Sequence, residues 1–183
     1  MNRFLVALVL VVTGAAHAAQ FSVVQLDKSS ITFVSKQMNV PVAGIFRIFG
    51  AQIFFDSARP ENGHALVDID LASIDAGSAD ANDEVKGKSW FNVRETPRAS
   101  FVSTAVTALG GGRFEANGKM SIKGKTQEIR APFTVKQEKN RLVVDGFFPL
   151  KRLDYGIGTG IWSDTSVVAD EVQVKFHFLL TRQ

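Results

Sequence analysis

Apolar and polar residues alternate with a period of two along most of the chain. Val67, Ile69 and Leu71 are separated by Asp68 and Asp70, a pattern typical of a half-buried strand with one solvated face. The same alternation recurs over residues 31–36, 42–56, 99–107, 113–122, 128–136, 141–150 and 170–180. The pattern therefore predicts about eight β-strands after residue 20.

Short turn signals separate the later strands. They are Gly110-Gly111-Gly112, Lys123-Gly124-Lys125 and Glu138-Lys139-Asn140. Links of this length join antiparallel neighbours, and about eight such strands protect their edges best by closing on themselves. We therefore predict an all-β fold, an extended antiparallel up-and-down β-barrel of about eight strands, with a flattened β-sandwich as the alternative. Gly44 and Gly50 are expected to let the long strand over 42–56 bend.

One stretch breaks the alternation. Residues 79–88 are rich in helix formers and carry acidic residues early, which predicts a short helix that runs into Trp90-Phe91. No internal repeat, linker or low-complexity tract interrupts the chain after residue 18, so we expect a single domain over residues 19–183.

The first residues have the order of a secretory signal. Met1-Asn2-Arg3 is positively charged, residues 4–12 are all apolar, and Ala16-His17-Ala18 offers a small-residue cleavage site. The alternative is a membrane anchor, but a helix over residues 4–12 would span only about 14 Å, roughly half of a bilayer core. We therefore expect residues 1–18 to be a cleaved signal peptide and the mature protein to reside in the periplasm.

Composition and charge narrow the possible functions. The chain has 15 Phe against two Trp and one Tyr, which suits either a packed core or a surface that contacts only apolar groups. The formal charge of +3 is scattered without a basic run, which argues against nucleic-acid binding. The absence of Cys excludes disulfides and thiolate chemistry.

Residues with catalytic potential are scattered. His64 and His177 are isolated, so neither a metal site nor a metal cofactor is predicted. The carboxylates of Asp68 and Asp70 could serve as acid and base, but we favour the simpler interpretation that they form the solvated face of a strand. The motif Gly156, Gly158, Gly160 opens no evident helix and is interpreted as a loop over a barrel end rather than a phosphate site.

Several segments together resemble the YceI family, described as polyisoprenoid-binding, lipocalin-like periplasmic proteins. The resemblance spans nearly all of the chain after residue 18, in order. The matching segments are 30–33, 42–46 with Phe49, 53–56, 67–75, 83–86, Trp90-Phe91, Pro97 with 99–101, 118–124 and 151–158. Gln37, Ala76 and Tyr155 depart from the expected His, Thr and Phe, which leaves the ligand's identity open.

The resemblance implies a lipocalin-like barrel with an apolar tunnel for a long prenyl or acyl chain. Strand alternation then gives the side chains expected to face inward: Ile31, Phe33, Phe46, Ile53, Phe55, Val67, Ile69, Phe101, Phe114, Met120, Phe133, Phe147 and Phe176. Each of them could also be ordinary core. Tyr155 and Trp162 are expected to act as lids, and Lys36, Arg152 and Asp154 are candidates for contacting a polar head group at the mouth.

These observations predict a periplasmic carrier, not an enzyme, for an isoprenoid-type lipid such as a polyisoprenoid, a quinone or a quinone precursor. A fatty acid or fatty amide is the alternative ligand. An enzyme using Asp154, Asp70 or His177 as acid or base, and an interaction module with a fully packed barrel, are the rival classes. No cofactor is expected beyond the lipid, and transient contact with a membrane or membrane protein, or a homodimer, remains open.

Overall fold

The computed structural model describes residues 21–182, so the predicted signal peptide lies outside the described residues. The strands are β1 (Val23–Val24), β2 (Ser30–Gln37), β3 (Val40–Phe46), β4 (Phe49–Phe54), β5 (His64–Asp70), β6 (Ile74–Asp75), β7 (Arg98–Gly110), β8 (Arg113–Ile122), β9 (Lys125–Glu138), β10 (Arg141–Lys151) and β11 (Glu171–Thr181). One α-helix is described, α1 (Ala79–Lys86), together with the 3-10 turns η1 (Leu26–Lys28), η2 (Pro60–Asn62), η3 (Leu71–Ser73), η4 (Arg152–Tyr155) and η5 (Gly160–Ser163).

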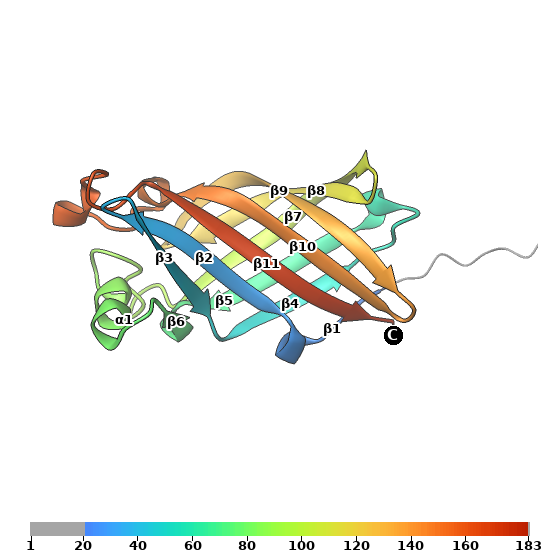
Figure 1. Cartoon of the computed structure of the whole chain (residues 1–183), viewed down its shortest axis with the longest axis horizontal. Helices are drawn as coiled ribbons and strands as arrows, with labels where there is room; N and C mark the ends of the chain where they lie inside the picture. Colours follow the sequence, from blue (N-terminus) through green and yellow to red (C-terminus); the bar gives the residue numbers. More distant parts are fainter. Residues whose placement is uncertain (1–20, 183) are drawn as a thin grey trace, which may run out of the picture.

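All strands belong to one antiparallel sheet that curls into an elongated barrel (Figure 1). The order of pairing is β4-β5-β7-β8-β9-β10-β11-β2-β3-β6. β3 and β4 are successive halves of one segment that bends at Arg47 and Ile48. The first half pairs with β2 and the second half with β5, so the two ends of the path meet in the same stretch of chain. Counted in this way, the long strands number eight, as the sequence pattern predicts.

Two short strands add to the sheet, one near the end of β4 and one beside the bend. β1 pairs with the last residues of β11, while Phe21 forms a bridge with Phe55 just after β4. On the other side, β6 pairs with the end of β3 through Ile45 and Phe46. The predicted bend at Gly44 and Gly50 is wrong, because both glycines lie within paired strands on either side of the break.

The predicted helix is confirmed, ending two residues earlier than the sequence pattern indicates. Ser78 caps α1 by accepting a hydrogen bond from the Ala81 amide at 3.2 Å. The side chain of Asn82 accepts a hydrogen bond from the Ala76 amide at 2.6 Å, which fixes α1 to the end of β6. No helix within residues 21–182 is long and apolar enough to cross a membrane.

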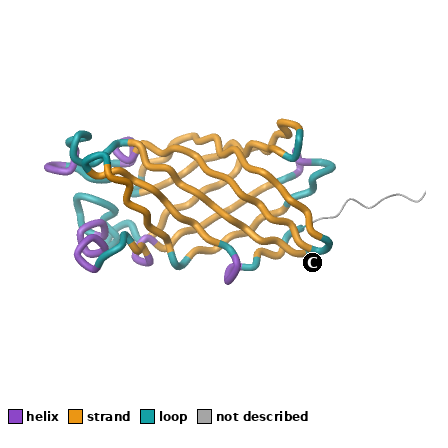
Figure 2. Tube along the Cα trace, viewed as in Figure 1, coloured by secondary structure: helices purple, strands orange, loops and turns teal. Residues whose placement is uncertain are grey.

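The two ends of the barrel differ. α1, η4 and η5 lie at one end, here called the mouth end, and the turn at Gly110–Gly112 lies at the other, here called the far end (Figures 1 and 2). At the far end Phe55, Phe114 and Phe133 pack together, with ring centroids 5.0 Å to 5.8 Å apart. The interior is therefore filled by side chains at the far end, and any space for a ligand is expected toward the mouth end.

Candidate ligand-binding cavity

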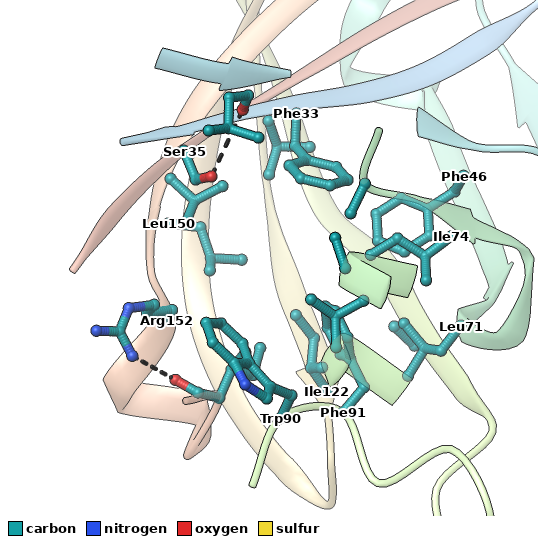
Figure 3. Close-up of a pocket in the computed structure, with 18 of the residues that line it drawn as sticks. Phe33, Ser35, Phe46, Leu71, Ile74, Trp90, Phe91, Ile122, Leu150 and Arg152 are labelled. Carbon is teal, nitrogen blue, oxygen red and sulfur yellow. Dashed lines mark hydrogen bonds between the residues drawn. The ribbon is translucent and has the colours of Figure 1, made fainter. Parts of the chain in front are cut away.

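A cavity of about 460 Å³ occupies the mouth half of the barrel (Figure 3). Its walls are inward-facing side chains of the strands, closed on one side by α1 and the Trp90-Phe91 segment. Gln37, Asp80 and Glu84 line the cavity and are also exposed, so the cavity reaches the surface at the mouth end. A volume of this size falls within the range of small-molecule sites, about 300–1,000 Å³.

A second cavity of about 100 Å³ follows deeper in the barrel. Ile31, Ile69, Met120 and Val174 line both cavities, so the two adjoin along the interior. Every residue that lines the second cavity is apolar except His64, whose ring stacks on Phe54 at 5.4 Å. Together the adjoining cavities have a largely apolar lining that suits an extended hydrocarbon chain, with polar residues in the wall of the first one.

Most of the predicted inward residues line this interior. The first cavity contacts Ile31, Phe33, Phe46, Ile69 and Met120, and the second also contacts Ile53, Phe55, Val67, Phe101, Phe133 and Phe176. Phe114 faces inward but lines neither cavity, because it is buried in the aromatic cluster of the far end. Contact of these residues with a ligand stays a prediction.

Three of the lining phenylalanines lie flat against the wall. The rings of Phe33 and Phe176 cover the glycines paired with them on the neighbouring strand, Gly44 and Gly146. A Cβ at Gly44 would overlap the Phe33 ring and would lie 2.7 Å from the Asp75 carbonyl oxygen. These rings therefore occupy space beside the backbone that only glycine leaves free, and they project less into the interior.

Phe101 also lies over a glycine, although the residue paired with Phe101 is Met120. Its ring covers Gly118 of β8, where a Cβ would also lie 2.6 Å from the Val102 carbonyl oxygen. The Phe101–Gly118 pair extends the flattened wall into the second cavity.

Phe147 was expected to face inward, and this prediction is wrong. Its side chain is 51% exposed on the outer wall, while Phe148 is buried and lines the second cavity. In β10 the inward positions are Leu142, Val144, Phe148 and Leu150, so Phe147 shares its face with the exposed Asp145. Because Phe147 and Phe148 are adjacent, their own identity does not show which of them faces inward, and the exposed Asp145 two residues before Phe147 decides it.

Two tryptophans stand at the mouth end. Trp90 and Trp162 both line the first cavity, and their ring centroids are 5.5 Å apart. The indole nitrogen of Trp90 donates a hydrogen bond to Glu84 of α1 at 3.0 Å. The role of Trp162 as a lid stays a prediction. Trp90 is a second aromatic residue at the mouth, outside the strands whose alternation gives the inward positions.

Tyr155 was also expected to be a lid, but the structure places it in the core. It is the last residue of η4, is 2% exposed, belongs to the buried hydrophobic core and lines neither cavity. Its hydroxyl is buried without a hydrogen-bond partner among the described residues. Burial, with a smaller effect of the Asp154 carboxylate, raises the pKa of Tyr155 to about 12.

Arg152 was expected to contact a ligand head group, but its side chain is occupied elsewhere. It is 2% exposed, and its guanidinium lies 5.7 Å from the centroid of the Trp90 ring. The guanidinium donates five hydrogen bonds of 2.7–3.0 Å, all to backbone carbonyls, those of Ile157, Gly158, Trp162, Val168 and Ala169. Since an arginine side chain has five N–H groups, none is left for a ligand. Burial lowers the pKa of Arg152, and the negative charge of Asp170 opposes this shift.

Arg152 lines the first cavity, but the other two head-group candidates lie outside both cavities. Lys36 and Asp154 are exposed and line neither one. Besides Arg152, the polar residues that line the first cavity are Ser35, Gln37, Asp80 and Glu84. The alternation of β2 places Ser35 and Gln37 on the same face as Ile31 and Phe33, so the sequence pattern is sufficient to predict that these two polar residues line the cavity. The hydroxyl of Ser35 donates to the Val42 carbonyl at 3.5 Å (Figure 3).

The residues considered for catalysis do not meet in the cavity. Asp70 caps η3 by accepting a hydrogen bond from the Ala72 amide at 2.9 Å. His177 and Asp145 form an exposed pair on neighbouring strands, with Nδ1 and Oδ1 2.7 Å apart. Asp68, Asp70, Asp154 and His177 all lie outside both cavities.

Comparison with known proteins identifies relatives over most of the chain. The family model described as "YceI-like domain" matches residues 23–180. A UPF0312 protein of Azotobacter vinelandii is 33% identical over 86 residues, covering 47% of this chain and 45% of that protein. A UPF0312 protein of Shewanella denitrificans is 31% identical over 118 residues, covering 64% of this chain and 56% of that protein. The chain therefore matches about half the length of these curated relatives.

Solved structures show the same fold. The crystal structure of BcnA from Burkholderia cenocepacia has 47% sequence identity and a TM-score of 0.84, covering 86% of this chain and 99% of that one. A polyisoprenoid binding domain from Saccharophagus degradans, implicated in plant cell wall breakdown, has 19% identity and a TM-score of 0.69, covering 91% of this chain and 100% of that one.

Proposed function

The chain belongs to the family of YceI-like domains, and from this premise we propose that it binds a long, uncharged isoprenoid-type lipid inside the barrel and carries it in the periplasm. The observation that carries the proposal is the apolar interior formed by the two adjoining cavities. A polyisoprenoid, a quinone or a quinone precursor has the required chain. The description of the Saccharophagus degradans neighbour as a polyisoprenoid binding domain agrees with this ligand class.

Burial of a hydrocarbon chain against this lining provides enough free energy for binding in the micromolar range. Burial of about ten methylene groups contributes roughly 8 kcal/mol before the cost of ordering the chain and the protein. This gross value corresponds to a Kd of about 1 μM, and a longer prenyl chain would exceed it.

The polar residues at the mouth favour an uncharged ligand over a fatty acid. Among the described residues that line the first cavity, Arg152 is the only cation, and all of its N–H groups are bonded to carbonyls. A carboxylate head group would instead lie near Asp80 and Glu84, whose charges oppose it. A carbonyl or hydroxyl end could accept or donate hydrogen bonds with Ser35 and Gln37.

A carrier role, rather than catalysis, agrees with where the acidic and basic groups lie. A lipid-modifying enzyme needs an acid or base within hydrogen-bond reach of the bound chain. Asp70, Asp154 and His177, the residues considered for that role, line neither cavity. Two carboxylates do line the first cavity, those of Asp80 and Glu84, but both residues are exposed at its mouth. We therefore propose that the lipid is released unchanged.

The test is lipid analysis of protein purified from its native host. Native mass spectrometry should show one apolar molecule per protein, and organic extraction should identify a prenyl chain by mass. Phe33→Asp places a charge in the first cavity and should abolish the bound mass, whereas Phe147→Asp on the outer wall should retain it. Both variants are first checked for folding by circular dichroism. An empty wild-type protein that takes up no added prenyl alcohol would refute the proposal, and conversion of the lipid would indicate an enzyme.

A further inference from the structure

The mouth end carries exposed apolar side chains beside the opening of the first cavity. The two most exposed large apolar residues of the described chain are Ile161 at 83%, within η5, and Met38 at 67%, in the turn between β2 and β3. Val40, at the start of β3, is 61% exposed, and both segments lie at the mouth end (Figure 1). Ile161 immediately precedes Trp162, which lines the cavity. Single exposed apolar residues need no explanation, but a group beside a lipid cavity indicates an interaction surface.

These residues belong to two segments that are held together, residues 36–41 and 159–163, here called the rim. The amide of Met38 donates a hydrogen bond to the Val167 carbonyl at 2.8 Å, and Gln37 forms a bridge with Val168. Arg152 fixes the same loop through the carbonyls of Trp162 and Val168. The apolar side chains are therefore presented by a structured edge.

The charge of the rim indicates which surface it fits. Lys36 is its only charged residue, so attraction to a strongly charged partner is weak. The remaining rim residues are uncharged and nearly all exposed, which suits shallow insertion into the interface of a phospholipid bilayer. A long apolar lipid resides in such a bilayer, because its concentration in water is very low.

We propose that the rim docks on the surface of a phospholipid bilayer and sets the opening of the first cavity against the membrane, so that the lipid enters and leaves without crossing water. This proposal rests on the proposed function. Ile161 and Met38 insert into the interface, and Trp162 lies at the junction between bilayer and cavity. Docking depends on apolar contact more than on lipid charge.

Flotation with phosphatidylcholine vesicles tests the docking. Wild-type protein should float with the vesicles, and severalfold higher ionic strength should not release it. Ile161→Asp and Met38→Asp should each lower the vesicle-bound fraction about tenfold, because each replaces an inserted apolar side chain by a charge. Leu109→Asp is the matched control, since Leu109 is 49% exposed next to the turn of the far end and should behave as wild type.

Equilibrium binding of farnesol separates this proposal from the proposed function. Both tryptophans of the chain line the cavity, so their fluorescence reports farnesol binding directly. Ile161 and Met38 line neither cavity, so their variants should bind farnesol as wild type does. If farnesol fails to bind wild type, the proposed function falls.

The remaining outcomes concern the rim alone. If farnesol binds but vesicle binding is absent, unchanged in both rim variants, or equally lowered by Leu109→Asp, the docking proposal is overturned and the carrier function stands. If light scattering shows a dimer that Ile161→Asp dissociates while wild type does not float, the rim is a contact between copies, and docking on membranes is likewise overturned.

Discussion

Replacement of Arg152 by lysine tests how the loop at the mouth end is held. The five N–H groups of Arg152 reach five backbone carbonyls within residues 157–169. A lysine ammonium has three N–H groups, so at least two of these carbonyls would lose their donor in a buried site. At about 1–3 kcal/mol for each unsatisfied group, Arg152→Lys should lower the free energy of unfolding by roughly 2–6 kcal/mol.

Tryptophan fluorescence during urea unfolding measures this loss where it arises. Arg152 and the five carbonyls that it binds are here called the clamp. The chain has two tryptophans, and both contact the Arg152 guanidinium, Trp90 through its ring and Trp162 through its carbonyl. Lys151→Ala is the matched control, because Lys151 is an exposed cation one residue away and its loss should change stability by less than about 0.5 kcal/mol. A destabilised clamp should also loosen Trp162, so farnesol should dissociate faster from Arg152→Lys than from wild type.

The reasoning would be refuted by a small effect. If Arg152→Lys loses less than about 1 kcal/mol and farnesol dissociates at the wild-type rate, the carbonyls find other donors and the loop does not depend on the guanidinium. A loss of stability with unchanged dissociation would show that the clamp supports the fold but not the cavity.

Further predictions concern the core and the cavity wall. The one tyrosine of the chain, Tyr155, should titrate at a pKa of about 12 in absorbance at 295 nm. Because this pKa is raised from 10.0, the residue's contribution to stability is complete below pH 10 and lost as pH rises to about 12, a decline that Tyr155→Phe should lack. Gly44→Ala should push the Phe33 ring into the first cavity and weaken farnesol binding about tenfold in fluorescence titration, with a cost of about 1–3 kcal/mol in unfolding. Val42→Trp should fill part of the same cavity and reduce farnesol stoichiometry while leaving the urea midpoint near that of wild type.

The strands and their order could be predicted because one physical signal governs them. Alternation of apolar and polar residues defines each strand and its buried face, as at Val67, Ile69 and Leu71, and short turns make neighbours antiparallel. The signal fails where both faces carry apolar residues. Phe147 and Phe148 are consecutive, and only the position of Asp145 in the same strand decides which of them faces inward.

The polar residues at the mouth could not be assigned from residue type. Arg152 directly follows β10 and Lys36 lies near the end of β2, and either could have met a head group. The structure buries Arg152 because the loop of residues 157–169 folds around it, and the conformation of that loop depends on tertiary contacts that no local pattern encodes. Tyr155 was misplaced for the same reason, since η4 turns it inward.

Phenylalanine has opposite effects on the two halves of the barrel, and glycine accounts for the difference. At the far end Phe55, Phe114 and Phe133 stack across the interior and fill it. Along the hollow part, Phe33 and Phe176 lie over glycines and keep to the wall. A barrel of about eight strands can fill itself with side chains, so the available volume depends on whether each ring has a glycine to lie on. The glycines facing these rings therefore set the capacity of the cavity, while the rings supply its apolar surface.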